Sequence, residues 1–142
     1  MSSPMNEVSD SELKSVIADF LEMGHVENIV SMFKKEPLYY GWTGEILQDE
    51  RFNVRLGLTI LFEELRSQGE DRIEQALPSL KTLLDHESSL IRGEAVSILG
   101  IIGTDEAIRL VRSKTDDTSP QVREMAAMAL EEWQENNEKS TK

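Results

Sequence analysis

The chain holds few side chains of the types, and at the spacings, that chemistry requires. It has 142 residues and no cysteine, which excludes disulfides, thiolate nucleophiles and cysteine-bound zinc. Its two histidines, His25 and His86, stand far apart in the sequence. No serine has a plausible histidine–acid pair for nucleophilic catalysis near it in the sequence, and no glycine-rich phosphate loop follows a strand pattern. We therefore expect a protein that is not an enzyme, with no catalytic residues, cofactor or metal.

Carboxylates are numerous, but they are spread along the chain as on a solvated surface. There are 27 acids against 15 lysines and arginines, a formal net charge of −12. DNA-binding proteins need cations that displace counterions from phosphates, so this balance excludes a nucleic-acid partner. It is typical either of a soluble surface or of one that attracts a basic protein partner.

Targeting segments are not evident in the sequence. No apolar run approaches the roughly 20 residues of a membrane span, so we expect no membrane partner. The first residues, Met-Ser-Ser-Pro-Met-Asn-Glu, lack the basic start and apolar region of a secretion signal. The expected location is the cytoplasm.

The first part of the chain is predicted to form a helical hairpin over residues 9–36, after a disordered segment 1–8. Ser9 and Glu12 have the spacing of a capping box, which starts a helix. Gly24 is a typical helix stop. Pro37 ends the second helix, because the residue before a proline avoids the α region.

From residue 37 onward a pattern recurs, marked by an apolar residue followed by arginine. The three pairs are Val54-Arg55, Ile91-Arg92 and Val122-Arg123. Apolar residues follow each arginine at helical spacing, and an acid precedes it by six or seven positions. A repeat of 20–50 residues with helix-turn-helix content indicates a helical array. The predicted repeats are 37–68, 70–103 and 104–133, followed by a polar tail, 134–142, that we expect to be disordered.

These segments resemble a known repeat family. Ala76-Leu77-Pro78 through Asp85, followed by Leu90-Ile91-Arg92 through Leu99-Gly100, resembles the HEAT repeat. Asp105–Ile108 with Gln121–Leu130 is similar to the shorter HEAT-like repeats of bilin lyases. The resemblance implies an all-α fold, an α-α superhelix of about four helical hairpins. Residues 9–36 would then be a divergent cap, which repeat arrays require at their ends.

The resemblance also implies roles for the recurring acids and arginines. In HEAT-like arrays the turn aspartate and the second-helix arginine bond between adjacent repeats and form a ladder. Here the resemblance assigns that role to Asp85, Arg92, Asp116 and Arg123.

The family also includes a di-iron hydroxylase whose metal is held by His-Glu pairs just after the arginine. Those places read Gly93-Glu94 and Glu124-Met125 here, so the ligand histidines are missing. His86-Glu87 lies in a turn, the wrong place for a ligand pair. The resemblance therefore implies no metal site in this chain.

The segment Tyr39-Tyr40-Gly41-Trp42 concentrates aromatic residues. On an α-helix Tyr39 and Trp42 share a face, which would pack the N-terminal hairpin onto the first repeat. Tyr40 would point about 100° away from Tyr39, so we expect at least one of the two rings to be exposed. Aromatic residues dominate interface hot spots, so Tyr40 and Trp42 are candidates for partner contact.

The resemblance further implies that the second helices line a concave face. Subtracting the core positions leaves an apolar strip with an acidic rim, which suits a basic or amphipathic segment laid in a groove. The candidate partner-binding residues on it are Leu56, Ile60, Glu63, Glu94, Ser97, Met128 and Glu131.

Three functions remain open at this point. The first is a non-enzymatic module that binds a protein segment on its concave face, favoured by the array, the acidic rim and the missing catalytic residues. The second is a bilin-lyase-like or cofactor-chaperone activity. The third is a self-associating structural protein, with the strip as a homodimer interface.

Overall fold

The computed structural model describes residues 8–140, and within them the chain is helical, with no strand. The predicted disordered segment 1–8 lies outside this range except for Val8, which is exposed. The α-helices are α1 (Asp10–Glu22), α2 (Val26–Lys35), α3 (Thr43–Leu47), α4 (Phe52–Ser67), α5 (Leu77–Thr82), α6 (Ser89–Ile102), α7 (Asp105–Ser113) and α8 (Pro120–Ser140).

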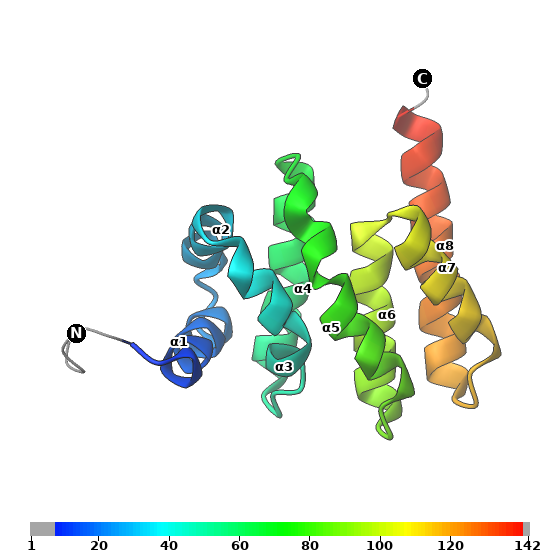
Figure 1. Ribbon diagram of the computed structural model, residues 1–142. Helices are drawn as coiled ribbons and strands as arrows, with labels where there is room; N and C mark the ends of the chain where they lie inside the picture. The colour runs from blue at the N-terminus through cyan, green and yellow to red at the C-terminus, as the bar shows by residue number, and fades with distance from the viewer. Residues whose placement is uncertain (1–7, 141–142) are drawn as a thin grey trace.

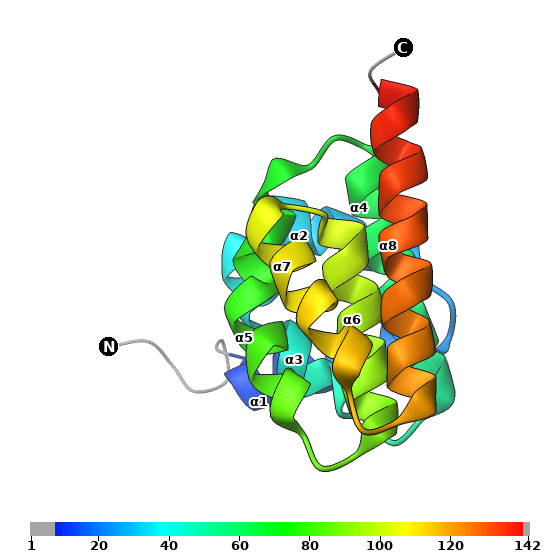
Figure 2. The same cartoon turned by 90° about the vertical axis from the view of Figure 1, so that its right-hand side faces the viewer.

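The helices stack as hairpins in two layers. Helices α4, α6 and α8 stand side by side, and α3, α5 and α7 form the other layer (Figures 1 and 2). Both α1 and α2 pack on α4, so the first hairpin covers the N-terminal end of the array. The prediction of an all-α superhelix of about four hairpins is confirmed.

Local signals define several of the helix ends, including the predicted start at Ser9. The side chains of Ser9, Ser88 and Thr104 each accept the backbone N–H three residues on, and so cap α1, α6 and α7. Gly103 ends α6 with a φ of 68°, a left-handed conformation that favours glycine.

The core lies between the two layers, and small residues set how closely the helices approach. A Cβ at Gly100 of α6 would lie 2.7 Å from the Cβ of Ala129 on α8. A Cβ at Gly57 of α4 would lie 2.9 Å from the backbone oxygen of Leu21 on α1. The neighbouring helices therefore pack against glycine backbone at these two crossings.

The first helices of the two central repeats begin as 3₁₀ segments, Pro37–Trp42 and Asp71–Ala76. This geometry has three residues per turn, so the orientation expected of Tyr40 on an α-helix is wrong. Tyr40 is fully buried, and its ring packs edge-on against Phe33 and Phe62 at centroid distances of 5.0 and 6.2 Å. Burial raises the pKa of Tyr40 to about 12.

The arginine of each second helix binds the turn of its own repeat. Its Nη1 donates to the backbone carbonyl six positions earlier, in the pairs Arg55–Asp49, Arg92–His86 and Arg123–Asp117. The side chain at that earlier position in turn accepts a backbone N–H two residues on. Asp49, His86 and Asp117 are therefore equivalent positions in three equivalent turns.

At one of these turns the arginine of the preceding repeat also binds. Arg92 Nε and Nη2 donate to the two carboxylate oxygens of Asp117 at 3.0 and 2.9 Å, and these bonds lower the pKa of Asp117 to about 2. The assignment of the ladder to Asp85 and Asp116 is therefore wrong by one position. Asp85 and Asp116 are both exposed. The next residue in each turn, His86 or Asp117, accepts the backbone N–H two residues on, and this bond turns its side chain toward the array.

We call the contact between two successive repeats a joint. At the joint before this one, between α4 and α6, His86 stands where the ladder acid would be. Arg55 is 7% exposed, and its Nε has no hydrogen-bond acceptor among the described residues. The carboxylate that it approaches belongs to Glu94, with Oε1 3.9 Å from Nε. The joint between α4 and α6 therefore lacks the bidentate ion pair that the next joint has.

The prediction of a disordered tail from residue 134 is wrong for residues 134–140. They continue α8 to Ser140, and the helix extends past the rest of the array (Figure 1). The segment contains good helix formers and neither glycine nor proline, so the helix has no local reason to end with the core.

Candidate functional site

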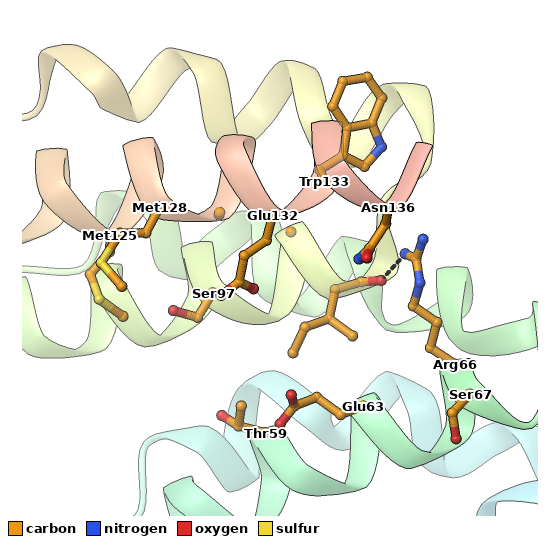
Figure 3. A pocket seen from close by; sticks show the side chains of 13 residues that line it. Thr59, Glu63, Arg66, Ser67, Ser97, Met125, Met128, Glu132, Trp133 and Asn136 are labelled. Atoms are coloured by element: carbon orange, nitrogen blue, oxygen red, sulfur yellow. Dashed lines mark hydrogen bonds between the residues drawn. The ribbon is translucent and has the colours of Figure 1, made fainter. Parts of the chain in front are cut away.

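A groove of about 610 Å³ lies across the layer of second helices, and we call it the C-terminal groove (Figure 3). Helix α6 forms its floor, with α4 and α8 as its two banks. Its lining residues are Thr59, Glu63, Arg66 and Ser67 from α4, Ser97, Gly100 and Ile101 from α6, and Met125, Met128, Ala129, Glu132, Trp133 and Asn136 from α8.

The groove combines an apolar bank with acids on both sides. Met128 is 51% exposed, and the half-buried Met125 and Ile101 continue the apolar surface beneath it. Glu63 on α4 and Glu132 on α8 are both exposed and line opposite banks (Figure 3). The groove thus offers flexible apolar side chains together with one carboxylate on each bank.

One end of the groove is held by bonds to the last turn of α6. The guanidinium of Arg66 donates to the backbone carbonyl of Ile101, as the dashed line in Figure 3 marks. The indole Nε1 of Trp133 donates to the carbonyl of Gly103 at 3.1 Å. These carbonyls lie at a helix C-terminus, where cations and donors are favourable. Arg66 is thus engaged with the fold, and the acids dominate what the groove presents.

The predicted concave strip is divided between two grooves. Glu63, Ser97 and Met128 line the C-terminal groove. Leu56 and Ile60 instead line a second groove, of about 660 Å³, between the α1–α2 hairpin and α4. The division follows from α4 itself, because its two flanks face different neighbours.

Four other predicted residues, Tyr40, Trp42, Glu94 and Glu131, lie outside the C-terminal groove. Tyr40 is buried, so it cannot contact a partner as predicted. Trp42 is half-buried, 4.9 Å from the ring of Tyr39 and beneath the Lys14 ammonium at 5.2 Å. Glu131 is exposed but is not among the lining residues.

Glu94, predicted on the acidic rim, is partly buried beside Arg55. Its side chain is 18% exposed, and burial raises the pKa of its carboxyl, with Arg55 acting in the opposite direction. It therefore stabilises the buried arginine at the α4–α6 joint and is a poor rim residue.

Sequence reasoning missed Met125 and the engaged Arg66. Met125 lies one helical turn before Met128, so the same helical face of α8 could have indicated it. The bond from Arg66 to Ile101 joins residues 35 positions apart, and no local pattern signals it.

The residues do not fit a metal centre of the His-Glu kind. No group of three histidine, cysteine, aspartate or glutamate side chains within residues 8–140 is placed to hold a metal ion. His86 Nδ1 accepts the backbone N–H of Ser88 at 2.9 Å, and Glu94 faces the cation of Arg55. Both side chains are thus engaged in the packing of the repeats.

The stacked hairpins and their groove define a helical-repeat protein. A family model of HEAT repeats matches residues 42–131, more than half of the chain, and the chain belongs to the HEAT-repeat family. It is also similar to a deoxyhypusine hydroxylase of Candida albicans, with 39% identity over 66 residues. That match covers 44% of this chain and 21% of the relative, so the chain spans about a fifth of that protein's length.

Among the helices between residues 8 and 140, none combines the length and the apolar character that crossing a membrane requires.

Proposed function

We propose that this protein is a non-enzymatic HEAT-repeat module that holds an amphipathic, basic helical segment of a partner protein in the C-terminal groove. The observation that carries the proposal is the exposed Met128 with Met125 and Ile101, in a groove that also has Glu63 on one bank and Glu132 on the other. A partner helix would lay its apolar face on the methionines and its lysines or arginines toward the two acids.

The chemistry of the lining supports this kind of ligand. Methionine is flexible and polarizable, so it adapts to apolar side chains of different shapes. A helix with its side chains is about 10–12 Å across and offers anchors at i, i+3, i+4 and i+7. Carboxylates at a rim contribute mainly to association rate and to the choice of a basic partner. The chain's net charge of −12 acts in the same direction.

A hydroxylase activity, which the similarity to a deoxyhypusine hydroxylase raises, has less support. The match covers about a fifth of that protein. The places after Arg92 and Arg123 hold Gly93-Glu94 and Glu124-Met125, and Glu94 is paired with Arg55. The groove residues instead favour binding without chemistry.

Fluorescence anisotropy with a labelled synthetic peptide tests the proposal. The probe has leucines at i, i+3, i+4 and i+7 and lysines on the flanks, and a second peptide replaces each lysine with glutamate. We expect the basic peptide to bind and the acidic peptide to fail.

Glu131 is the sequence neighbour of Glu132 on α8 but does not line the groove, so it provides a control for the loss of an acid. Glu63→Gln with Glu132→Gln should weaken the basic peptide about tenfold at low salt, and less at high salt, because screening reduces the lost attraction. Glu131→Gln removes an exposed acid outside the groove and should leave affinity unchanged. Equal losses for both changes, or no binding of the basic peptide, would overturn the proposal.

A further inference from the structure

The second groove, which we call the N-terminal groove, lies between the α1–α2 hairpin and the other flank of α4. Its lining comes from the end of α1, the turn after it, the start of α2 and one flank of α4, and it includes Glu22, Glu27, Asn28, Asn53, Leu56, Ile60 and Glu64. It encloses about 660 Å³ and shares none of its lining residues with the C-terminal groove.

Its charge is of one sign. Glu22, Glu27 and Glu64 line it, and neither lysine nor arginine does. Glu22 is partly neutralised by Arg51, whose Nη1 lies 2.9 Å from its Oε1, and Glu64 accepts a hydrogen bond from Gln68. Glu27 forms no ion pair within residues 8–140. The charge of the groove therefore favours a ligand that carries positive charge.

Two amides distinguish this groove from the C-terminal one. Asn28 on α2 and Asn53 on α4 are exposed, and within the described part of the chain neither amide has a hydrogen-bond partner. An asparagine side chain offers both a donor and an acceptor, which match a peptide backbone. The backbone of a helical ligand is already paired internally, whereas an extended segment leaves its N–H and C=O groups free.

The apolar residues fit the same geometry. Leu56 and Ile60 lie one helical turn apart on α4 and are 43% and 42% exposed. An extended segment points successive side chains to opposite sides, so it can place aliphatic residues on Leu56 and Ile60 and basic ones toward the acids.

We propose that the N-terminal groove is a second docking site, which takes an extended segment of a partner protein that alternates aliphatic residues with lysine or arginine. The two amides bind its backbone, Leu56 and Ile60 its aliphatic side chains, and Glu27 with Glu64 its cations. This site rests on its own residues and stands whether or not the C-terminal groove binds a helix.

Two labelled peptides of identical composition test the proposal. One alternates lysine and leucine, and its isomer places the same residues with helical periodicity. We expect Asn28→Ala with Asn53→Ala to weaken the alternating peptide about tenfold, the equivalent of two ordinary hydrogen bonds, and to leave the helical isomer unchanged. Met128→Ala should do the reverse.

The outcomes separate the two grooves. The proposal is overturned if the alternating peptide does not bind, or if it loses affinity with Met128→Ala and ignores the asparagine changes. If the parent protein binds the alternating peptide and does not bind its helical isomer, the function proposed for the C-terminal groove is removed and the N-terminal site stands. Sedimentation that shows a dimer of this chain dispersed by the asparagine changes would assign the groove to a second copy and overturn the peptide ligand. Both asparagines are exposed, so we expect their alanine variants to fold, and circular dichroism verifies that each variant is folded.

Discussion

Replacing His86 with aspartate completes the ion-pair ladder at the joint where it is interrupted. His86 occupies the turn position that Asp117 holds one repeat later, and Arg55 occupies the position of Arg92. The two Arg92–Asp117 bonds, at 3.0 and 2.9 Å, show what the equivalent pair would form. An aspartate can also keep the turn bond that His86 makes with the N–H of Ser88.

The expected gain comes from satisfying a buried cation. Hydrogen bonds to charged groups contribute about 1.5–3 kcal/mol. Ordering the new carboxylate offsets part of this, so we expect His86→Asp to raise the free energy of unfolding by about 1–2 kcal/mol. For a chain of this size that corresponds to a rise in Tm of about 3–8 °C. Chemical denaturation followed by circular dichroism measures the first quantity and calorimetry the second.

Two controls isolate the ion pair. His86→Asn retains an acceptor for the Ser88 N–H without a charge, and should leave stability within about 0.5 kcal/mol of the parent. In the Arg55→Gln background the aspartate should lose its advantage, because its partner is gone. A His86→Asp protein no more stable than the His86→Asn protein would refute the equivalence of the three turns.

Three further predictions concern other joints and the groove. Asp117→Asn should lower the free energy of unfolding by about 1–3 kcal/mol at neutral pH. Because Arg92 lowers the folded-state pKa of Asp117 to about 2, this difference should be full above about pH 4 and vanish as the pH falls through 2, in urea titrations at each pH. Gly100→Ala should cost about 1–3 kcal/mol, because its Cβ would lie 2.7 Å from that of Ala129, and an equal Tm for the variant and parent would contradict the close crossing. Met128→Ala should weaken the amphipathic basic peptide about tenfold with little change in salt dependence, since it removes apolar contact only; an altered salt slope with unchanged affinity would contradict this.

Most of the secondary structure could be predicted because its causes are local. The caps at Ser9 and Thr104 and the glycine at Gly103 act within a few residues of the helix ends that they define. The repeated Val-Arg or Ile-Arg pairs set the register of the second helices, and the apolar spacing after them determined the core faces. These features led to the helical array without reference to any contact between repeats.

The candidate site was predicted only in part, because its residues come together through packing between helices. Met128, Glu63 and Ser97 do share a groove, but Leu56 and Ile60 lie in another, since the two flanks of α4 face different neighbours. No local pattern distinguishes those flanks. The partner contact expected of Tyr40 was wrong because its ring is buried in a 3₁₀ segment.

Helices, repeats and the acidic character of the chain could be read from the order of the residues, because propensity, capping and charge depend on residues near one another in the chain. Tertiary structure alone decided that Asp117, and not Asp116, binds Arg92, and that Glu94 is held beside Arg55. It also decided that two grooves exist. The physical reason is that ion-pair partners and groove banks depend on distances of a few ångströms between residues about 25 to 70 positions apart, which the rigid stacking of the hairpins sets.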